Sequence, residues 1–213
     1  MKPQWQVGID VGGTFTDVVA LDPTGQEMRT AKVQSRASDP RAGLRAALAA
    51  VGLEWETVAD LVHGTTLVTN AIVEDRLAKV ALITTQGFGD TLAIGRQNRK
   101  HLYRLDLAPK PTPQVPAERR IEISERLDAH GNILVAMTNE AIDEAVNQAL
   151  TTGAEAIAVS LLHAYANAAH EQKVGAALRP AALPVAFSHQ VNPEAREYER
   201  TATTVLSASV MPL

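Results

Sequence analysis

The chain of 213 residues contains no cysteine, few aromatic residues and no long apolar run. The absence of cysteine excludes disulfides, a thiolate nucleophile and cysteine-ligated zinc. No stretch approaches the roughly 20 apolar residues of a membrane-spanning helix. The residues before Val7 also lack the roughly 7–15 apolar residues of a signal peptide. We therefore expect a cytoplasmic protein without a membrane partner.

A basic surface is missing as well. The formal net charge is -4, and the pI is near 5.9. Nucleic acid and anionic membranes attract proteins through clustered positive charge, so neither is an expected partner. Hydrophobic residues make up 46% of the chain and charged residues 21%, which is typical of a globular protein.

The first half of the chain alternates between apolar strands and helices. Asp39 and Pro40 are a typical start of a helix, with aspartate as the cap and proline in the first turn. The pattern predicts strands over 6–11, 16–22 and 26–33, a helix over 39–52, a short strand over 60–62, a helix over 67–76 and a strand over 79–84.

The second half begins with a proline-rich extended connection over residues 106–120. Strands that alternate with helices of 10–15 residues indicate parallel β-α units, so the fold class is α/β. We predict two parts, residues 1–105 and 106–213. The expected elements are a hairpin with strands 120–127 and 133–136, helices over 139–151 and 168–178, strands over 156–160 and 185–188, and a helix from 193.

The stretch from Gly8 to Asp17 carries the strongest functional signal. A strand delivers Asp10 to its end, and Gly12 and Gly13 then permit a tight turn and the close approach of a ligand. Successive backbone N–H groups in such a turn form an anion-binding concavity, to which Thr14 and Thr16 could add hydroxyl donors.

Two carboxylates flank this turn. Asp10 and Asp17 could hold a hydrated magnesium ion that bridges phosphate oxygens, so the stretch fits the tail of a nucleoside triphosphate. The alternative is a plain hairpin in which the glycines only permit the turn, with Thr16 as a structural hydroxyl. The sequence contains neither a Walker-type loop nor a G-x-G-x-x-G motif.

Five further blocks extend the pattern in a fixed order along the chain. Together with the first loop they resemble the N-terminal region of the hydantoinase/oxoprolinase family, within the actin-like ATPase superfamily. The blocks are His63–Thr66 with Thr69–Ala71, Thr84–Asp90, Ile94–Gln97, Ser160–Asn167 and Arg196–Thr201.

The resemblance implies an actin-like (ribonuclease H-like) half-domain with a β-hairpin phosphate loop, a mixed sheet and β-α units. It also implies ATP and Mg²⁺ as cofactors and a small cyclic amide or ketone as substrate. In the hydrolases of this family the γ-phosphoryl group is expected to pass to the carbonyl oxygen and so activate it for attack by water. Such chemistry requires mainly positioning and charge neutralisation from the protein. Carried over by position, Gly12, Gly13 and Thr14 would contact the β- and γ-phosphates, and Asp10 would hold magnesium through water.

A second group of candidates follows the strand that ends at Val62. His63, Thr65 and Thr66 could bind a carbonyl or move a proton, and Asn70 shares a helix face with Thr66. The alternative is a threonine-capped helix start with His63 bonded to backbone.

Two charged positions later in the chain also leave alternatives open. Arg96 could hold a carboxylate or phosphate in its guanidinium fork, or be a surface arginine. Glu197 and Arg200 are a possible ion pair, with a solvated helix face as the alternative.

The apolar stretch over residues 203–213 has no polar tail, so we expect a truncated chain. By the resemblance, such a piece would lack the second phosphate loop and be inactive alone, and the rest of the polypeptide or a second subunit would complete the site. Three functions stay open: an ATP-dependent hydrolase of cyclic amides, a subunit of an ATP-dependent ketone carboxylase, and a non-catalytic actin-like scaffold or sensor.

Overall fold

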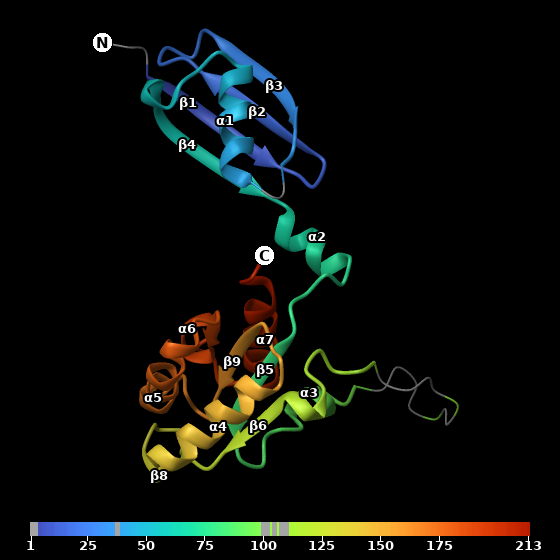
Figure 1. The fold of residues 1–213 in the computed structure, drawn as a ribbon, viewed down its shortest axis with the longest axis vertical. Coiled ribbons are helices and arrows are strands. Elements are labelled where there is room, and N and C mark those ends of the chain that lie inside the picture. Colours follow the sequence, from blue (N-terminus) through green and yellow to red (C-terminus); the bar gives the residue numbers. More distant parts are fainter. Residues whose placement is uncertain (1–3, 37–38, 99–102, 104–105, 107–110) are drawn as a thin grey trace. The chain divides into compact units, whose positions relative to one another are not determined.

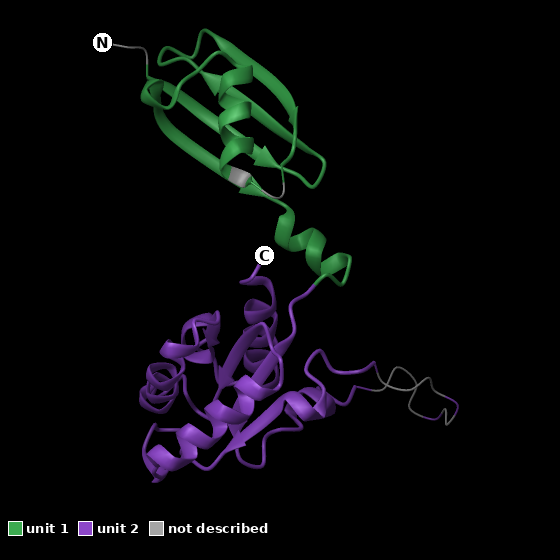
Figure 2. Ribbon diagram, in the orientation of Figure 1, with its two compact units in different colours: residues 1–76 green, residues 77–213 purple. Residues whose placement is uncertain are grey.

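A computed structural model describes residues 4–36, 39–98, 103, 106 and 111–213 (Figure 1). The chain divides into two compact units, Met1–Arg76 and Leu77–Leu213, here unit 1 and unit 2 (Figure 2). This division differs from the one predicted between residues 105 and 106. The strand that follows residue 77 pairs with strands from the second half of the chain, and this pairing was not visible in the sequence. Part of the proline-rich connection lies outside the described residues.

Unit 1 is built on a four-stranded mixed sheet in the order β3-β2-β1-β4. Its strands are β1 (Trp5–Val11), β2 (Phe15–Leu21), β3 (Met28–Gln34) and β4 (Val58–Thr65). The first three are antiparallel neighbours, whereas β4 runs parallel to β1. The single-turn helix η1 (Trp55–Thr57) precedes β4, and helix α2 (Leu67–Val73) follows it.

One face of this sheet is covered by helix α1 (Pro40–Ala50) (Figure 1). Asp39 caps the helix as expected, because its carboxylate accepts a hydrogen bond from Ala42 N at 3.0 Å. Side chains on alternate strand positions, including Ile9 and Val18, pack with Leu48 of the helix to form the core of unit 1. The opposite face, here the open face, therefore carries the intervening residues of each strand.

Unit 2 contains a four-stranded parallel sheet in the order β10-β9-β5-β6. Its strands are β5 (Val80–Thr85), β6 (Arg120–Ile123), β9 (Ala156–Ser160) and β10 (Val185–Phe187). Every residue of β5 and β9 is buried, as is usual for central strands of a parallel sheet with both faces covered.

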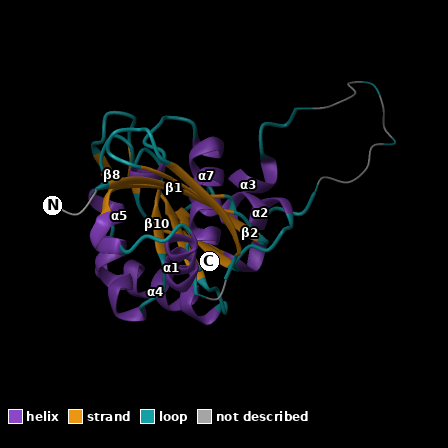
Figure 3. Ribbon diagram, turned by 90° about the horizontal axis from the view of Figure 1, so that it is seen from above, coloured by secondary structure: helices purple, strands orange, loops and turns teal. Residues whose placement is uncertain are grey.

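Helices cover both faces of the unit 2 sheet. Figure 3 shows the helices of the chain in purple and the strands in orange. Helices α4 (Asn139–Thr151) and α5 (Ala169–Leu178) pack on one face, and α7 (Glu197–Val210) packs on the other. The shorter elements are α3 (Thr91–Ile94), η2 (Ala117–Arg119), η3 (Arg179–Ala181) and α6 (Ser188–Val191). Among the residues that the structure describes, no helix is long and apolar enough to cross a membrane.

The predicted hairpin over residues 120–136 is wrong in its first strand. Residues 120–123 form β6 and join the parallel sheet beside β5, and only the short strand β7 (Arg126–Leu127) pairs with β8 (Ile133–Val135). The break lies at Glu125, which is buried, contacts Thr85 Oγ1 and accepts a hydrogen bond from His170 Nδ1 at 2.7 Å. These distant partners determine where the strand ends.

Candidate functional site

The turn between β1 and β2 is held in place through its carbonyl groups. Ser35 N donates to Thr14 O at 2.9 Å, and Ser35 Oγ donates to Gly12 O at 2.8 Å. Inside the turn, Gly12 N donates to Phe15 O at 2.9 Å. The loop of residues 12–14, here the hairpin loop, is thus fixed from the β3 side.

Two N–H groups of the hairpin loop are not used by these bonds. In the described part of the chain, the N–H groups of Gly13 and Thr14 donate to no other protein group, and both residues are exposed. Adjacent unpaired N–H groups in a tight turn are the feature that binds anions. Of the three predicted donors, the Gly12 N–H already donates to Phe15 O. The N–H groups of Gly13 and Thr14 are therefore the ones that could bind an anion.

Asp10 and Asp17 lie opposite each other on adjacent strands. Asp10 is also aligned with Gly64 on β4, where an added Cβ would lie 3.4 Å from Asp10 Oδ1, so glycine leaves room for the carboxylate. Asp17 forms an exposed ion pair with Lys32 Nζ at 3.0 Å. Because Lys32 already compensates Asp17, Asp10 is the better candidate for a cation.

A metal at Asp10 would need most of its ligands from water or phosphate. Among the described residues, no group of three or more His, Cys, Asp or Glu side chains could hold a metal ion. A single carboxylate completed by water and phosphate oxygens fits magnesium, which keeps several waters and binds through one or two carboxylates plus substrate phosphates.

The end of β4 and the start of α2 lie beside the hairpin loop. Thr65 Oγ1 and Thr66 N both donate to Val11 O at 3.2 Å. Asn70 Nδ2 donates to Thr66 Oγ1 at 3.4 Å and lies 3.4 Å from the position of a Cβ added to Gly13. Three predicted site residues that are more than fifty positions away in sequence are therefore brought to the loop.

Two other predicted residues do not join this group. His63 is aligned with Ile9, which belongs to the core, so it lies on the other side of the sheet from Asp10. Thr16 is buried, and its hydroxyl is 2.9 Å from Ser35 Oγ. Because Ser35 Oγ already donates to Gly12 O, Thr16 is the donor in this contact. The geometry favours the structural alternative for Thr16.

Arg96 belongs to unit 2 and takes part in a different feature. Its Nε donates to Glu199 Oε1 at 2.6 Å, and its guanidinium carbon lies 5.9 Å from the centre of the Tyr198 ring. This hydrogen bond from Arg96 lowers the pKa of the Glu199 carboxyl below its usual value.

The ion pair between Glu197 and Arg200 forms, but it is not on a solvated face. Arg200 is fully buried and also donates to Leu161 O at 2.8 Å and Glu194 O at 3.0 Å. Arg200 thus connects α7 to the loop that follows β9.

Ser35 fixes the hairpin loop but was not predicted from the sequence, because a lone serine after a strand carries no functional signal.

Comparison with known proteins extends these findings. A family model described as the hydantoinase/oxoprolinase N-terminal region matches residues 6–181. An uncharacterized protein of Methanocaldococcus jannaschii is 38% identical over 98% of this chain and 31% of its own length. The caprolactamase subunit alpha of Pseudomonas jessenii is 34% identical over 100% of this chain and 32% of its own length.

Solved structures agree with the sequence matches. A nucleotide-free structure of acetone carboxylase, an ATP-dependent enzyme, matches with a TM-score of 0.86 at 26% identity, over 99% of this chain and 32% of that one. This match confirms the predicted α/β fold class. The chain spans about a third of the length of the curated relatives it matches.

Proposed function

Because this chain belongs to the hydantoinase/oxoprolinase family, as its N-terminal region, we propose that it supplies the first phosphate-binding loop of an ATP-dependent hydrolase of cyclic amides. The observation that carries the proposal is the pair of unpaired N–H groups at Gly13 and Thr14, in the loop that follows the strand of Asp10. ATP with magnesium would supply the phosphoryl group that activates the substrate carbonyl.

The residues of unit 1 have separate tasks in this proposal. The Gly13 and Thr14 N–H groups would bind the terminal phosphates, and Asp10 would hold a hydrated magnesium ion. Ser35 donates to the carbonyl groups of Gly12 and Thr14, and Thr16 donates to Ser35, so both loop carbonyls are engaged by the protein. Asn70 adds a side-chain amide within reach of the same loop.

A second candidate function is a subunit of an ATP-dependent ketone carboxylase, which the likeness in structure to acetone carboxylase favours. Both functions use the same hairpin loop. The relatives include subunits designated alpha, beta and gamma, so the site would be completed by a further subunit or by the rest of a longer polypeptide.

The test is ATP hydrolysis by the complete assembly that contains this chain. Release of ADP stimulated by cyclic amides supports the hydrolase, whereas stimulation by ketones that requires bicarbonate supports the carboxylase. An assembly that hydrolyses ATP equally fast with and without either compound class contradicts both proposals.

A further inference from the structure

Unit 2 contains a cavity of about 330 Å³ that is lined by α5 and β10, within the usual size range of small-molecule sites. Its walls come from residues 172–179 on one side and from residues 183–190 on the other. We propose that this cavity binds a small carboxylate with an apolar body. The inference goes beyond the proposed function, because it concerns neither the hairpin loop nor the nucleotide.

The walls of the cavity are largely apolar. Leu178, Leu183 and Val185 line it together with Phe187. Gly175 makes room for the Phe187 ring, because a Cβ at position 175 would come within 2.6 Å of Phe187 Cζ. The ring can therefore lie against α5, and the walls offer an apolar surface to the hydrocarbon part of a ligand.

His189 is held in one orientation through its Nδ1 atom. This nitrogen lies 2.5 Å from Oε2 of Glu171, whose side chain is fully buried. Glu171 Oε1 also accepts hydrogen bonds from Leu161 N at 2.9 Å and Ser188 Oγ at 2.6 Å. Because a carboxylate only accepts hydrogen bonds, Nδ1 of His189 carries a proton. The position of the imidazole ring is thus fixed before a ligand binds.

The second ring nitrogen of His189 is available to a ligand. In the described part of the chain, Nε2 has no hydrogen-bond partner and is not enclosed by protein atoms. An imidazole held in this way can carry a second proton at Nε2, because the Glu171 carboxylate compensates the charge of the imidazolium. Nε2 then donates a hydrogen bond to an oxygen of the ligand.

The charges of the lining favour an anion. Arg179 and His189 line the cavity, and no Asp or Glu is among its described lining residues. Arg179 is exposed and forms no ion pair or side-chain hydrogen bond within the part of the chain that the structure describes. A guanidinium without a partner can bind a carboxylate through two parallel hydrogen bonds. The carboxylate of a ligand therefore contacts Arg179 and His189, and its apolar body contacts the walls.

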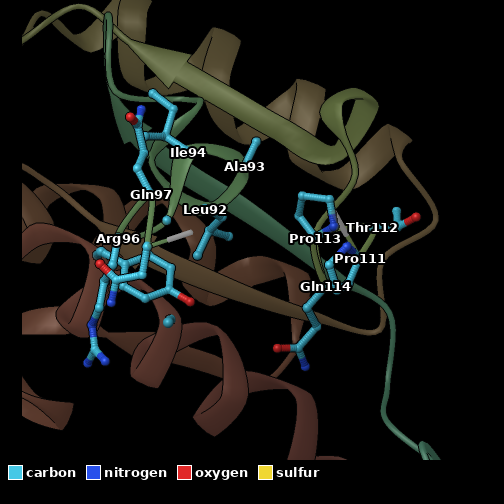
Figure 4. A pocket seen from close by; sticks show the side chains of 13 residues that line it. Leu92, Ala93, Ile94, Arg96, Gln97, Pro111, Thr112, Pro113 and Gln114 are labelled. Atoms are coloured by element: carbon cyan, nitrogen blue, oxygen red, sulfur yellow. The ribbon is translucent and has the colours of Figure 1, made fainter. Parts of the chain in front are cut away.

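Another cavity of unit 2, beside α3, also has an arginine among its lining residues (Figure 4). That arginine already has a carboxylate partner, because Arg96 Nε donates to Glu199 Oε1 at 2.6 Å. A ligand carboxylate would have to compete with Glu199 there. The unpartnered Arg179 therefore makes the cavity lined by α5 and β10 the better anion site.

The test compares three compounds that separate charge from shape. The ¹⁵N-labelled 213-residue chain is titrated without nucleotide with 4-methylpentanoate, with its uncharged amide 4-methylpentanamide, and with acetate, which lacks the apolar body. We expect saturable shifts of the Gly175, Phe187 and Gln190 amides with 4-methylpentanoate. The amide is expected to bind roughly 10-fold more weakly and acetate roughly 100-fold more weakly. The inference is overturned if 4-methylpentanoate gives no saturable shifts at these residues, or if either other compound binds as tightly.

A variant of Arg179 tests the charged contact. Arg179→Gln removes the guanidinium and is expected to weaken 4-methylpentanoate roughly 10-fold, with little change for 4-methylpentanamide. Lys173→Gln is the matched control, because it removes an exposed positive charge of α5 outside the cavity lining and should change neither affinity. Unchanged binding by a folded Arg179→Gln variant, or equal losses in both variants, contradicts the assignment of the carboxylate to Arg179.

A variant of His189 tests the hydrogen bond from Nε2. His189→Asn keeps a side-chain N–H that can donate to Glu171, but it lacks the Nε2 atom. We expect 4-methylpentanoate to bind this variant roughly 5-fold more weakly, with the dispersion of the amide spectrum retained. Unchanged affinity in a folded His189→Asn variant overturns the role assigned to Nε2. Because nucleotide is absent, these titrations and the test of the hairpin loop can fail independently of each other.

Discussion

At the scale of single residues, the proposed phosphate site consists of a few groups in and around the hairpin loop. Ser35 donates to the carbonyls of Gly12 and Thr14, whereas the N–H groups of Gly13 and Thr14 have no protein acceptor in the described part of the chain. Asp10, on the strand that leads into the loop, forms no ion pair in the described structure, unlike Asp17. The site therefore depends on backbone geometry more than on side-chain identity.

The role of Asp10 can be tested by replacing its charge. Asp10→Asn is expected to reduce manganese-dependent broadening of the Gly13 and Thr14 amide signals in the presence of ATP about tenfold, because a neutral amide is a poor cation ligand. The fold should be unaffected, since Asp10 is exposed. Asp60→Asn on β4 is the matched control, because Asp60 is also an exposed aspartate on the open face. Equal broadening in both variants would exclude Asp10 as the cation ligand.

Arg200 gives a residue-scale prediction about stability. Arg200→Ala is expected to lower the free energy of unfolding by about 3–5 kcal/mol, because it removes a buried guanidinium together with its ion pair to Glu197 and its hydrogen bonds to Leu161 O and Glu194 O. The exposed neighbour Arg196→Ala should change stability by less than about 0.5 kcal/mol. Urea unfolding followed by circular dichroism measures both, and similar midpoints for the two variants would contradict the assigned role.

At the scale of elements, local signals in the sequence were reliable. Residues 139–151 and 156–160 form α4 and β9 with the predicted bounds, and Asp39 with Pro40 starts α1. Caps, helical periodicity and short apolar runs depend on neighbours in sequence, so they can be recognised without the fold.

Signals that depend on distant partners were missed. The split of the predicted strand 120–127 depends on Thr85 and His170, which contact Glu125 from other elements. Strand β4 extends over 58–65 instead of the predicted 60–62, because it pairs with β1 along its length. In the candidate site, the contact between Thr66 and Asn70 follows from their spacing of four residues. The position of Asn70 beside Gly13 and the inward position of Thr16 depend on partners that are distant in sequence.

A side chain of strand β6 holds the loop that leads from β5 to α3 through hydrogen bonds to its backbone. Glu122 accepts hydrogen bonds from Gly87 N at 3.1 Å and Gly89 N at 2.9 Å. Glu122→Ala is expected to cost about 1–2 kcal/mol and to speed hydrogen exchange at residues 87–89. Glu118→Ala, at an exposed glutamate in η2, is the control and should change neither. Unchanged exchange at residues 87–89 in Glu122→Ala would show that the loop is held by other contacts.

At the scale of the whole molecule, the two units have separate hydrophobic cores. The core of unit 1 is formed by β1, β2 and α1, and unit 2 has one core on each face of its parallel sheet. Each core is made from residues of one unit alone.

Independent cores predict independent folding of the larger unit. A protein comprising residues 77–213 is expected to give a dispersed amide spectrum and a cooperative thermal transition, because both cores of the parallel sheet are retained. The 76 residues of unit 1 provide a smaller core, so we expect unit 1 alone to unfold at lower urea concentration. A collapsed or unfolded spectrum for residues 77–213 would show that unit 2 requires unit 1.

The most direct measurement is an amide-resolved NMR titration of the 213-residue chain with magnesium-ATP. We expect saturable shifts at Gly13 and Thr14 and a smaller shift at Gly12, whose N–H already donates to Phe15 O. Shifts confined to other residues, or none at the hairpin loop at saturating nucleotide, would contradict the assignment of this loop to phosphate.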